Sequence, residues 1–289
     1  MKVAIVHDWL TGMRGGERCL EVFCELFPQA HLYTLLHVPK STSPLIEQMP
    51  IRTSFIQNLP FSKKAYRKYL PLFPMAVESF SLKGYDLILS CSHCVAKGAI
   101  PPPDALHISY ILTPMRYAWD MYEEYFMGKR NRMILLFIHY LRIWDVTASQ
   151  RVDHFLCISK HVANRIKKFY RREAEVIHPP VDIKRFKLQN KKEDFFLIVS
   201  SFVPYKKINL AVEAFNRLGH PLKIIGAGPE RKRLSAMAKS NVQFLGWQSD
   251  EVVADYYSQC RALIFPGEED FGIVPLEAMA SGKPVIAYG

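Results

Sequence analysis

Residues 265–288, FPGEEDFGIVPLEAMASGKPVIAY, constrain the fold of this 289-residue sequence more than any other stretch. Residues 262–266 predict a short buried strand, residues 275–280 a helix, and residues 283–288 a second strand. A turn that contains Gly272 separates the first strand from the helix. A strand, a turn, a helix and a strand in this order predict one unit of a parallel α/β sheet.

The turn of this unit is suited to hold a ligand. Ligands of parallel sheets bind beyond the carboxyl ends of the strands, so the backbone N–H groups of Gly272, Ile273 and Val274 are expected to face an anion or a sugar. Glu269 and Glu277 flank the turn and can accept hydrogen bonds from hydroxyl groups. The alternative is that Glu269 only decorates the N-terminus of a helix.

Two glutamates separated by seven residues, within the runs GEEDFGIVP and SGKPVIA, resemble the signature of retaining glycosyltransferases with the GT-B fold. The resemblance implies two Rossmann-like, doubly wound domains that face a cleft. It also implies transfer of a hexose, with retention, from a nucleoside diphosphate sugar to a lipid-linked or saccharide acceptor in cell-surface polysaccharide biosynthesis. In this family Glu269 would contact the hexose and Glu277 the ribose hydroxyls of the donor.

The N-terminal run HDWLTGMRGGERCLEVFCELFP is similar to the opening of group 1, or family 4, glycosyltransferases. Gly15 and Gly16 follow a predicted strand over residues 2–7 and precede a predicted helix over residues 17–27. Glycine lets a backbone approach a phosphate closely, and the helix N-terminus adds partial positive charge. The pair is not a Walker loop, so the pattern alone is not specific. The resemblance implies that this loop faces the donor diphosphate.

Residues 110–126, YILTPMRYAWDMYEEYF, resemble the Thr-Pro-Met-Arg-Tyr segment of the polysaccharide mannosyltransferase-like subgroup. The resemblance makes mannose, carried by GDP, the first expectation for the sugar. Relatives often carry a histidine just before Thr-Pro, where this sequence has Leu112. An aromatic surface helix is the alternative interpretation. Four residues of the segment are expected to contact acceptor or sugar: Arg116, Tyr117, Trp119 and Asp120.

Lys206 lies in the loop after the first predicted strand of the second half, at the edge where a diphosphate would bind. In the resembling family the lysine of Pro-x-Lys contacts the donor phosphates, beside an arginine that is Ser201 here. We therefore expect Lys206 and Glu269 to be the catalytic residues. The sequence contains no Asp-x-Asp, so no metal ion and no other cofactor is expected. A solvated surface lysine is the alternative.

The predicted domains are 1–187, Rossmann-like and on the acceptor side, and 188–289, which binds the nucleotide sugar. The lysine-rich run KLQNKKED is typical of a linker. Val285 to Tyr288 predicts an apolar strand with no helix after it, so we expect the second domain to be incomplete at its C-terminus and the sequence to be truncated. A truncated or degenerate protein that binds nucleotide sugars without catalysis is the rival function.

Positive charge is concentrated in the first domain. Residues 1–187 carry 26 Lys and Arg against 16 Asp and Glu, a net charge of +10, and residues 188–289 carry 12 against 11. Basic clusters among aromatic residues suit an anionic membrane surface, although solvated helix faces are an equal alternative and no motif for nucleic acid accompanies them. The clusters contain Lys63, Lys64, Arg67 and Lys68; Lys129, Arg130 and Arg132; and Lys167, Lys168, Arg171 and Arg172.

A cytoplasmic location is expected, with peripheral attachment to the inner face of the membrane as one option. No apolar run approaches 18 residues, so no transmembrane span is predicted. The six cysteines fit reduced, packed thiols. Cys91 and Cys94 form a Cys-x-x-Cys pair, but no second ligand pair follows at the spacing of a zinc site.

Overall fold

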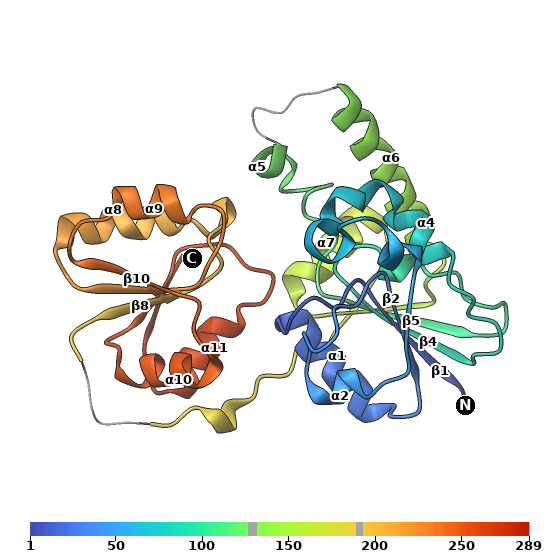
Figure 1. Ribbon diagram of the computed structural model, residues 1–289, viewed down its shortest axis with the longest axis horizontal. Helices are drawn as coiled ribbons and strands as arrows, with labels where there is room; N and C mark the ends of the chain where they lie inside the picture. The colour runs from blue at the N-terminus through green and yellow to red at the C-terminus, as the bar shows by residue number, and fades with distance from the viewer. Residues whose placement is uncertain (127–131, 189–192, 289) are drawn as a thin grey trace. The chain divides into compact units, whose positions relative to one another are not determined.

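The computed structural model describes residues 1–126, 132–188 and 193–288. Within these residues the chain forms two compact units, Met1–Pro180 and Val181–Gly289. Each unit holds a parallel sheet with helices packed on it (Figure 1). Lys129 and Arg130 of a predicted basic cluster, and residues 189–192 of the predicted linker, lie outside the described residues.

In the described part of the first unit, the strands form a 7-stranded sheet in the order β3-β2-β1-β4-β5-β6-β7, with all neighbours parallel. The strands are β1 (Val3–His7), β2 (His31–Thr34), β3 (Ile51–Thr53), β4 (Leu87–Ser92), β5 (Leu106–Ile111), β6 (His154–Cys157) and β7 (Glu175–Val176). The helices are α1 (Gly15–Leu26), α2 (Pro44–Glu47), α3 (Ser62–Ala65), α4 (Phe73–Glu78), α5 (Tyr122–Phe126), α6 (Arg132–Ser149) and α7 (Lys160–Tyr170). Shorter 3₁₀ turns are η1 (Phe55–Asn58), η2 (Tyr66–Leu72) and η3 (Ala96–Gly98).

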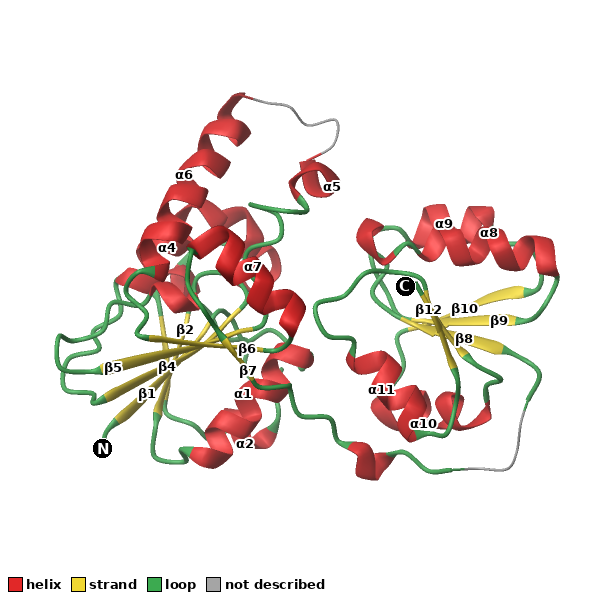
Figure 2. Cartoon of the chain, turned by 180° about the vertical axis from the view of Figure 1, so that it is seen from behind, coloured by secondary structure: helices red, strands yellow, loops and turns green. Residues whose placement is uncertain are grey.

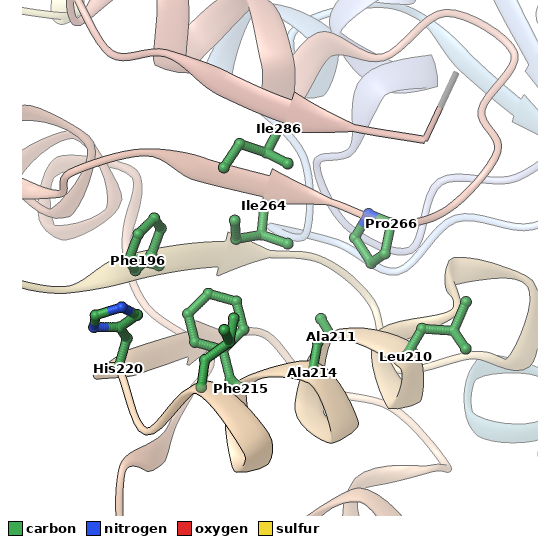
Figure 3. Close-up of a pocket in the computed structure, with 10 residues that line it drawn as sticks. Phe196, Leu210, Ala211, Ala214, Phe215, His220, Ile264, Pro266 and Ile286 are labelled. Atoms are coloured by element: carbon green, nitrogen blue, oxygen red, sulfur yellow. The ribbon is translucent and has the colours of Figure 1, made fainter.

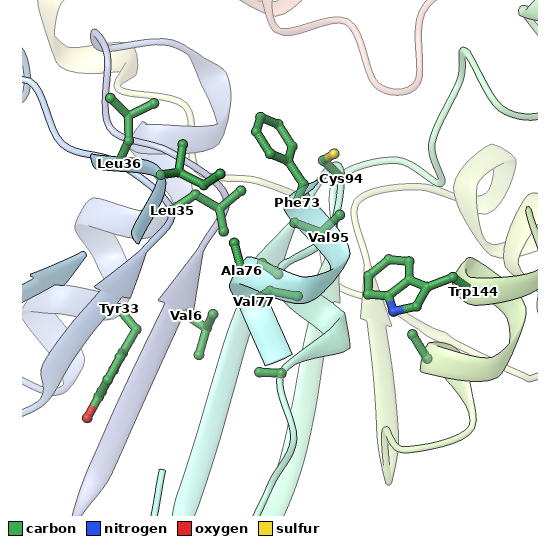
Figure 4. Packing of buried hydrophobic residues seen from close by; sticks show 14 of the residues in the cluster. Val6, Tyr33, Leu35, Leu36, Phe73, Ala76, Val77, Cys94, Val95 and Trp144 are labelled. Atoms are coloured by element: carbon green, nitrogen blue, oxygen red, sulfur yellow. The ribbon is translucent and has the colours of Figure 1, made fainter. Parts of the chain in front are cut away.

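Strand β1 is buried along its whole length because helices cover both faces of the sheet. Its side chains alternate between two apolar cores, as the pleat of a strand requires. Val3 and Ile5 belong to the core under α1 and α2, and Ala4 and Val6 to the core on the opposite face. Figure 4 shows this second core, which contains Val6, Tyr33, Leu35, Phe73, Ala76, Val77 and Trp144.

The second unit follows the same plan with a 5-stranded parallel sheet, in the order β10-β9-β8-β11-β12 over its described residues. Helices α8 and α9 lie on one face and α10 and α11 on the other (Figure 2). The strands are β8 (Phe196–Val199), β9 (Leu222–Ile225), β10 (Val242–Gly246), β11 (Leu263–Phe265) and β12 (Val285–Ala287). The helices are η4 (Ile183–Arg185), η5 (Pro204–Lys206), α8 (Ile208–Leu218), α9 (Arg231–Met237), α10 (Asp250–Gln259) and α11 (Ile273–Ala280). No helix in the described parts of the chain is long and apolar enough to cross a membrane.

Helix α11 begins two residues before the predicted residue 275. Gly272 immediately precedes it with a φ of 87°, a left-handed conformation that glycine adopts at little cost. Strand β11 is one residue shorter at each end than the predicted strand over residues 262–266. Strand β12 begins two residues later and ends one residue earlier than the predicted strand over residues 283–288. The predicted order of strand, glycine turn, helix and strand is confirmed.

The division between the units lies after Pro180, seven residues before the boundary that the sequence predicts. Residues 181–188 pack with the second unit instead of serving as the end of the first. Phe186 is buried against Tyr257, with ring centroids 5.8 Å apart in an edge-to-face arrangement. Arg185 donates to Asp250 at 2.8 Å. These partners lie about seventy residues further along the chain, so local composition does not reveal them.

Glycine allows the loop after β9 to approach the loop after β8. A Cβ at Gly226 would lie 1.8 Å from the carbonyl oxygen of Ser200, and Gly226 also has a φ of 137°. Its N–H donates to the carbonyl of Gly246 at 2.8 Å, so three loops at the carboxyl edge of the sheet are joined at this residue. No other amino acid fits here without a shift of the backbone.

We expect Gly226→Ala to destabilise the second unit by about 2 to 4 kcal/mol, because steric overlap adds to the cost of positive φ. Gly219→Ala is the matched control: Gly219 also has a positive φ, of 74°, but nothing lies within 4 Å of its Cβ position. The control should cost only about 1 kcal/mol. Hydrogen exchange in peptides of β8 and β9 measures the unit separately. Equal losses for the two variants would contradict the role of close packing.

Candidate functional site

The strand order of the second unit reverses beside β8. The chain proceeds outward from β8 to β9 and β10, then returns to place β11 on the other side of β8. Loops that leave neighbouring strands in opposite directions open a crevice at the carboxyl edge, where ligands of such sheets bind. The loops at this point are residues 200–207 and 266–272, which contain both residues predicted to be catalytic.

Lys206 and Glu269 form an ion pair at this edge. Lys206 ends η5 after β8, and Glu269 lies in the loop after β11. Their side chains are 14% and 21% exposed, so both charges are largely shielded yet open to a ligand. The sequence predicted the two residues separately, and the reversal of strand order brings them together. An ammonium beside a carboxylate offers a cation for phosphate and an acceptor for hydroxyl groups.

Gly267 makes this pairing possible. A Cβ at Gly267 would lie 2.8 Å from Lys206 Cα and 2.9 Å from its carbonyl oxygen, so the two loops touch backbone to backbone. Sequence reasoning did not single out Gly267. The sequence does contain a signal for this glycine, because Gly267 comes directly after the predicted strand over residues 262–266 and two residues before Glu269.

Gly272, Ile273 and Val274 lie at the start of α11, where the first N–H groups of a helix have no partner within the helix. This is the geometry that the sequence predicts for them. Glu277, further along the same helix, is buried. Whether it meets a ribose stays a prediction.

Both carboxylate oxygens of Glu277 have protein partners. The hydroxyl of Tyr257 donates to Oε2 at 3.0 Å, and Nη2 of Arg185 pairs with Oε1. Burial and the nearby Glu277 charge raise the pKa of the Tyr257 phenol well above its ordinary value, so it stays a donor. Arg185 also pairs with Asp250 and so ties residues 181–188 to two helices. The sequence analysis missed Arg185 because no motif of its own marks it.

A cavity of about 350 Å³ lies between α8 and strands β8, β11 and β12 (Figure 3). Its walls are apolar apart from His220, and include Phe196, Leu210, Phe215, Ile264, Pro266 and Ile286. Such a lining does not suit a diphosphate, which needs cations and N–H donors. We therefore place the candidate site at the Lys206–Glu269 pair and not in this cavity.

In the first unit, Gly16 packs against the side chain of Leu112. A Cβ at Gly16 would lie 2.9 Å from Leu112 Cδ1, so the glycine allows α1 to approach the end of β5. Gly15 is the first residue of α1, and the Glu17 carboxylate accepts the N–H of Arg14 at 3.0 Å just before it. The helix N-terminus therefore already carries a carboxylate. Contact of this loop with a diphosphate stays a prediction.

The segment that resembles mannosyltransferases is held by buried partners. The Trp119 indole donates to Asp145 at 2.8 Å and stacks on Phe169 with centroids 4.7 Å apart. Asp145 itself is fully buried, pairs with Lys97 and accepts the Tyr170 hydroxyl at 2.9 Å. These contacts show what holds the segment in place.

The remaining predicted residues of the segment are also engaged. The Tyr117 hydroxyl lies 2.9 Å from Cys94 Sγ, and Asp120 accepts from Arg165 at 2.5 Å. Arg116 lies half-buried in the same segment. A role for these residues toward acceptor or sugar stays a prediction, because the contacts described are internal.

Asp8, which follows β1, is fully buried and accepts four backbone N–H groups. Oδ2 accepts from His93 at 2.7 Å and Cys94 at 2.9 Å, and Oδ1 from Val95 at 2.6 Å and Ala96 at 2.8 Å. Burial alone would raise the pKa of Asp8, but His93, His7 and these N–H groups lower it below its ordinary value. The carboxylate thus joins the ends of β1 and β4, where the order of the first sheet reverses. The sequence analysis did not identify this contact.

No group of three or more His, Cys, Asp and Glu residues that could hold a metal ion occurs among the described residues. The six cysteines are buried and free. Burial raises the pKa of the Cys94 thiol well above its ordinary value, which keeps it protonated. A reaction without metal or cofactor remains a prediction.

We expect Asp8→Asn to destabilise the first unit by about 2 to 4 kcal/mol, because the amide turns its own N–H groups toward backbone donors. Since the folded pKa of Asp8 lies below 3.8, its contribution is complete above that pH and is lost as the pH falls through the folded value. Asp104→Asn, at an exposed aspartate of the same unit, is the control. Hydrogen exchange of residues 87–98 measures the stability of the first unit in both variants. Equal protection of these residues in Asp8→Asn and Asp104→Asn would contradict the role of Asp8.

Comparison with known proteins shows what the second unit and the chain are similar to. Residues 181–289 match the family model described as Glycosyl transferases group 1. An uncharacterized glycosyltransferase of Methanocaldococcus jannaschii is 31% identical over 145 residues, which cover 48% of this chain and 41% of that protein. The O-antigen chain mannosyltransferase RfbU of Salmonella typhimurium is 31% identical over 159 residues, 51% of this chain and 45% of that protein. The chain thus spans less than half the length of these curated relatives.

Two solved structures share the fold over 99% of this chain. Anabaena HepE in complex with UDP superimposes with a TM-score of 0.67 at 15% identity, covering 80% of that structure. Sucrose-phosphate synthase from Thermosynechococcus elongatus gives 0.69 at 17% identity, covering 81%. Identities this low show the fold alone, and that fold is GT-B. The predicted fold class and the predicted resemblance are confirmed.

Proposed function

We propose, because residues 181–289 match the model of group 1 glycosyl transferases, that this protein transfers a hexose from a nucleoside diphosphate sugar to a lipid-linked or saccharide acceptor. The carrying observation is the Lys206–Glu269 pair at the reversal of strand order in the second sheet. A cation next to a carboxylate suits a substrate in which an anionic diphosphate adjoins a neutral sugar rich in hydroxyl groups.

In the proposed reaction the acceptor oxygen forms a bond to the anomeric carbon, and the bond from that carbon to the diphosphate oxygen breaks. The acceptor proton leaves with the nucleoside diphosphate, and the anomeric configuration is retained. Lys206 stabilises the charge that grows on the leaving diphosphate, and Glu269 accepts hydrogen bonds from the hexose. The N–H groups of Gly272, Ile273 and Val274 assist at the start of α11. The leaving charge then needs no metal ion.

Mannose is the sugar we propose first, in the synthesis of a cell-surface polysaccharide. RfbU is named as an O-antigen chain mannosyltransferase, and a second relative, named as D-rhamnosyltransferase WbpZ of Pseudomonas aeruginosa, is 36% identical over 100 residues. That match covers 32% of this chain and 26% of WbpZ. These names support a hexose or deoxyhexose donor.

A donor screen tests the proposal. The purified protein is incubated with GDP-mannose, UDP-glucose and related donors in the presence of lipid-linked and free saccharides, and product mass and released nucleoside diphosphate are measured. We expect release that depends on the acceptor, with GDP-mannose the preferred donor. Binding of nucleotide without consumption of any donor would favour the rival function, a degenerate binding protein.

Lys206→Ala should cost about 2 to 4 kcal/mol of transition-state stabilisation, seen mainly as lower turnover at saturating donor. Lys232→Ala provides the control, because Lys232 is an exposed lysine on α9 of the same unit. It should leave turnover unchanged. Full turnover in Lys206→Ala would remove Lys206 from the mechanism.

We also propose that the first unit attaches peripherally to an anionic membrane from the cytoplasmic side. Lys63, Lys64, Arg67 and Lys68 are all exposed on α3 and η2. Phe61 beside them is 81% exposed. Helix α6 adds exposed apolar side chains, namely Met133, Leu135, Leu136, Tyr140 and Ile143. Basic and apolar groups on one unit suit a surface with anionic head groups over hydrocarbon.

Sedimentation with vesicles containing phosphatidylglycerol should decrease steeply as salt rises. Replacing Lys63, Lys64, Arg67 and Lys68 by Gln should weaken binding by roughly 1 kcal/mol per residue at low salt. A control with Lys232→Gln and Lys239→Gln, both exposed in the second unit, should bind as before. Equal binding to neutral phosphatidylcholine vesicles, or none to either kind, would show that these residues form only solvated helix faces.

A further inference from the structure

The sheet of the first unit has its own reversal point, between β1 and β4. Asp8 follows β1 and His93 follows β4, so the two residues meet at the carboxyl edge where parallel sheets bind ligands. Nδ1 of His93 lies 3.0 Å from Asp8 Oδ2. The proposed catalytic pair, Lys206 and Glu269, belongs to the other unit.

The ring of His93 is held in one orientation. Nδ1 of the ring lies 3.0 Å from Asp8 Oδ2, which also accepts the backbone N–H of His93, and the ring lies edge-on to Trp9 with centroids 4.5 Å apart. In a neutral imidazole whose Nδ1–H donates to a carboxylate, Nε2 carries the lone pair and accepts a hydrogen bond. The His93 side chain is 27% exposed, whereas that of Asp8 is fully buried. The ring therefore reaches solvent from a buried support.

Charged and titratable groups of both signs surround His93. The Glu17 carboxylate lies 3.8 Å from His7 Nε2, and the pKa of His7, which burial would lower, is raised above its ordinary value by Glu17 and Asp8. Asp8 and Glu17 thus stand with His7 and Arg14 around the ring. Burial, together with His7 and Arg14, lowers the pKa of His93, whereas Asp8 and Glu17 raise it. The pKa of His93 lies below its ordinary value as a result. A neutral ligand group adds no net charge to this cluster.

We propose that Nε2 of His93 accepts a hydrogen bond from a hydroxyl group of the saccharide acceptor. Asp8 is the positioning residue that selects the ring's tautomer and orientation. The inference rests on the proposed function, since it names a contact for the second substrate of that reaction. The hydroxyl donates its proton to this hydrogen bond and keeps it, so the contact binds the acceptor and takes no part in bond making. His93 undergoes no net change.

The test uses the full chain with the donor and acceptor that support transfer in the screen above. His93→Ala should lower kcat/KM for the acceptor about 10- to 100-fold, as expected for loss of one substrate hydrogen bond, and leave the Kd for the nucleoside diphosphate within about twofold. His93→Gln keeps an acceptor oxygen and should recover part of this loss. His154→Gln, at an exposed histidine at the start of β6, is the control and should match the wild type.

The pH profile separates this contact from a structural role. Protonation turns Nε2 into a donor, so wild-type kcat/KM for the acceptor should fall as the pH drops through a value below 6.5. His93→Gln should lack this acid limb, because its amide does not titrate. An acid limb that persists in His93→Gln, or a loss in His93→Ala that affects donor binding as strongly as acceptor kcat/KM, overturns the inference.

If the wild type consumes no donor, the proposed function fails. The protonation of the His93 ring nitrogens is then tested without the reaction. Nitrogen-15 spectra of the histidine rings, assigned with the His93→Gln variant, report which nitrogen of His93 carries the proton. A proton on Nδ1 supports the inference that Nε2 is the acceptor. A proton on Nε2 overturns it whatever the outcome of the screen.

Discussion

In both units the strand order reverses beside the first strand, which places β1 next to β4 and β8 next to β11. At these two points the loops after neighbouring strands leave in opposite directions, because their helices cover opposite faces of the sheet. Everywhere else along a sheet, adjacent loops cross to the same face and cover its carboxyl edge. The reversal therefore decides where chemistry-bearing residues can reach a ligand, and both clusters of charged residues described above lie there.

The two reversal points carry different chemistry. In the second unit a lysine and a glutamate, held together by the close approach at Gly267, offer a cation and an acceptor that suit a sugar diphosphate. In the first unit a buried carboxylate, Asp8, accepts four backbone N–H groups and lies 3.0 Å from Nδ1 of His93. The two reversal points therefore differ in the residue types that they present at the carboxyl edge.

Residues 110–126 of the first unit have a composition that suits sugar binding, but their side chains also make internal packing contacts. Trp119 and Asp120 belong to a segment whose composition suits contact with sugars, and both are bound to distant residues, Asp145 and Arg165. A side chain that is fixed internally still presents its remaining atoms in a defined direction. The aromatic residues of this segment thus serve the packing of the unit first, and any contact with substrate depends on that packing.

The sequence by itself determined the alternation of strands and helices and the glycine turn before Glu277, and it singled out Lys206 and Glu269 as candidate site residues, because periodicity and local motifs lie within short windows. It could not show that Asp8 holds His93, or that Arg185 binds Glu277, since these partners are 85 and 92 residues apart. Nor could it place the division of the chain after Pro180. Tertiary structure decided these points, because a buried polar group must find its partner wherever the strand order brings one, independent of distance along the chain.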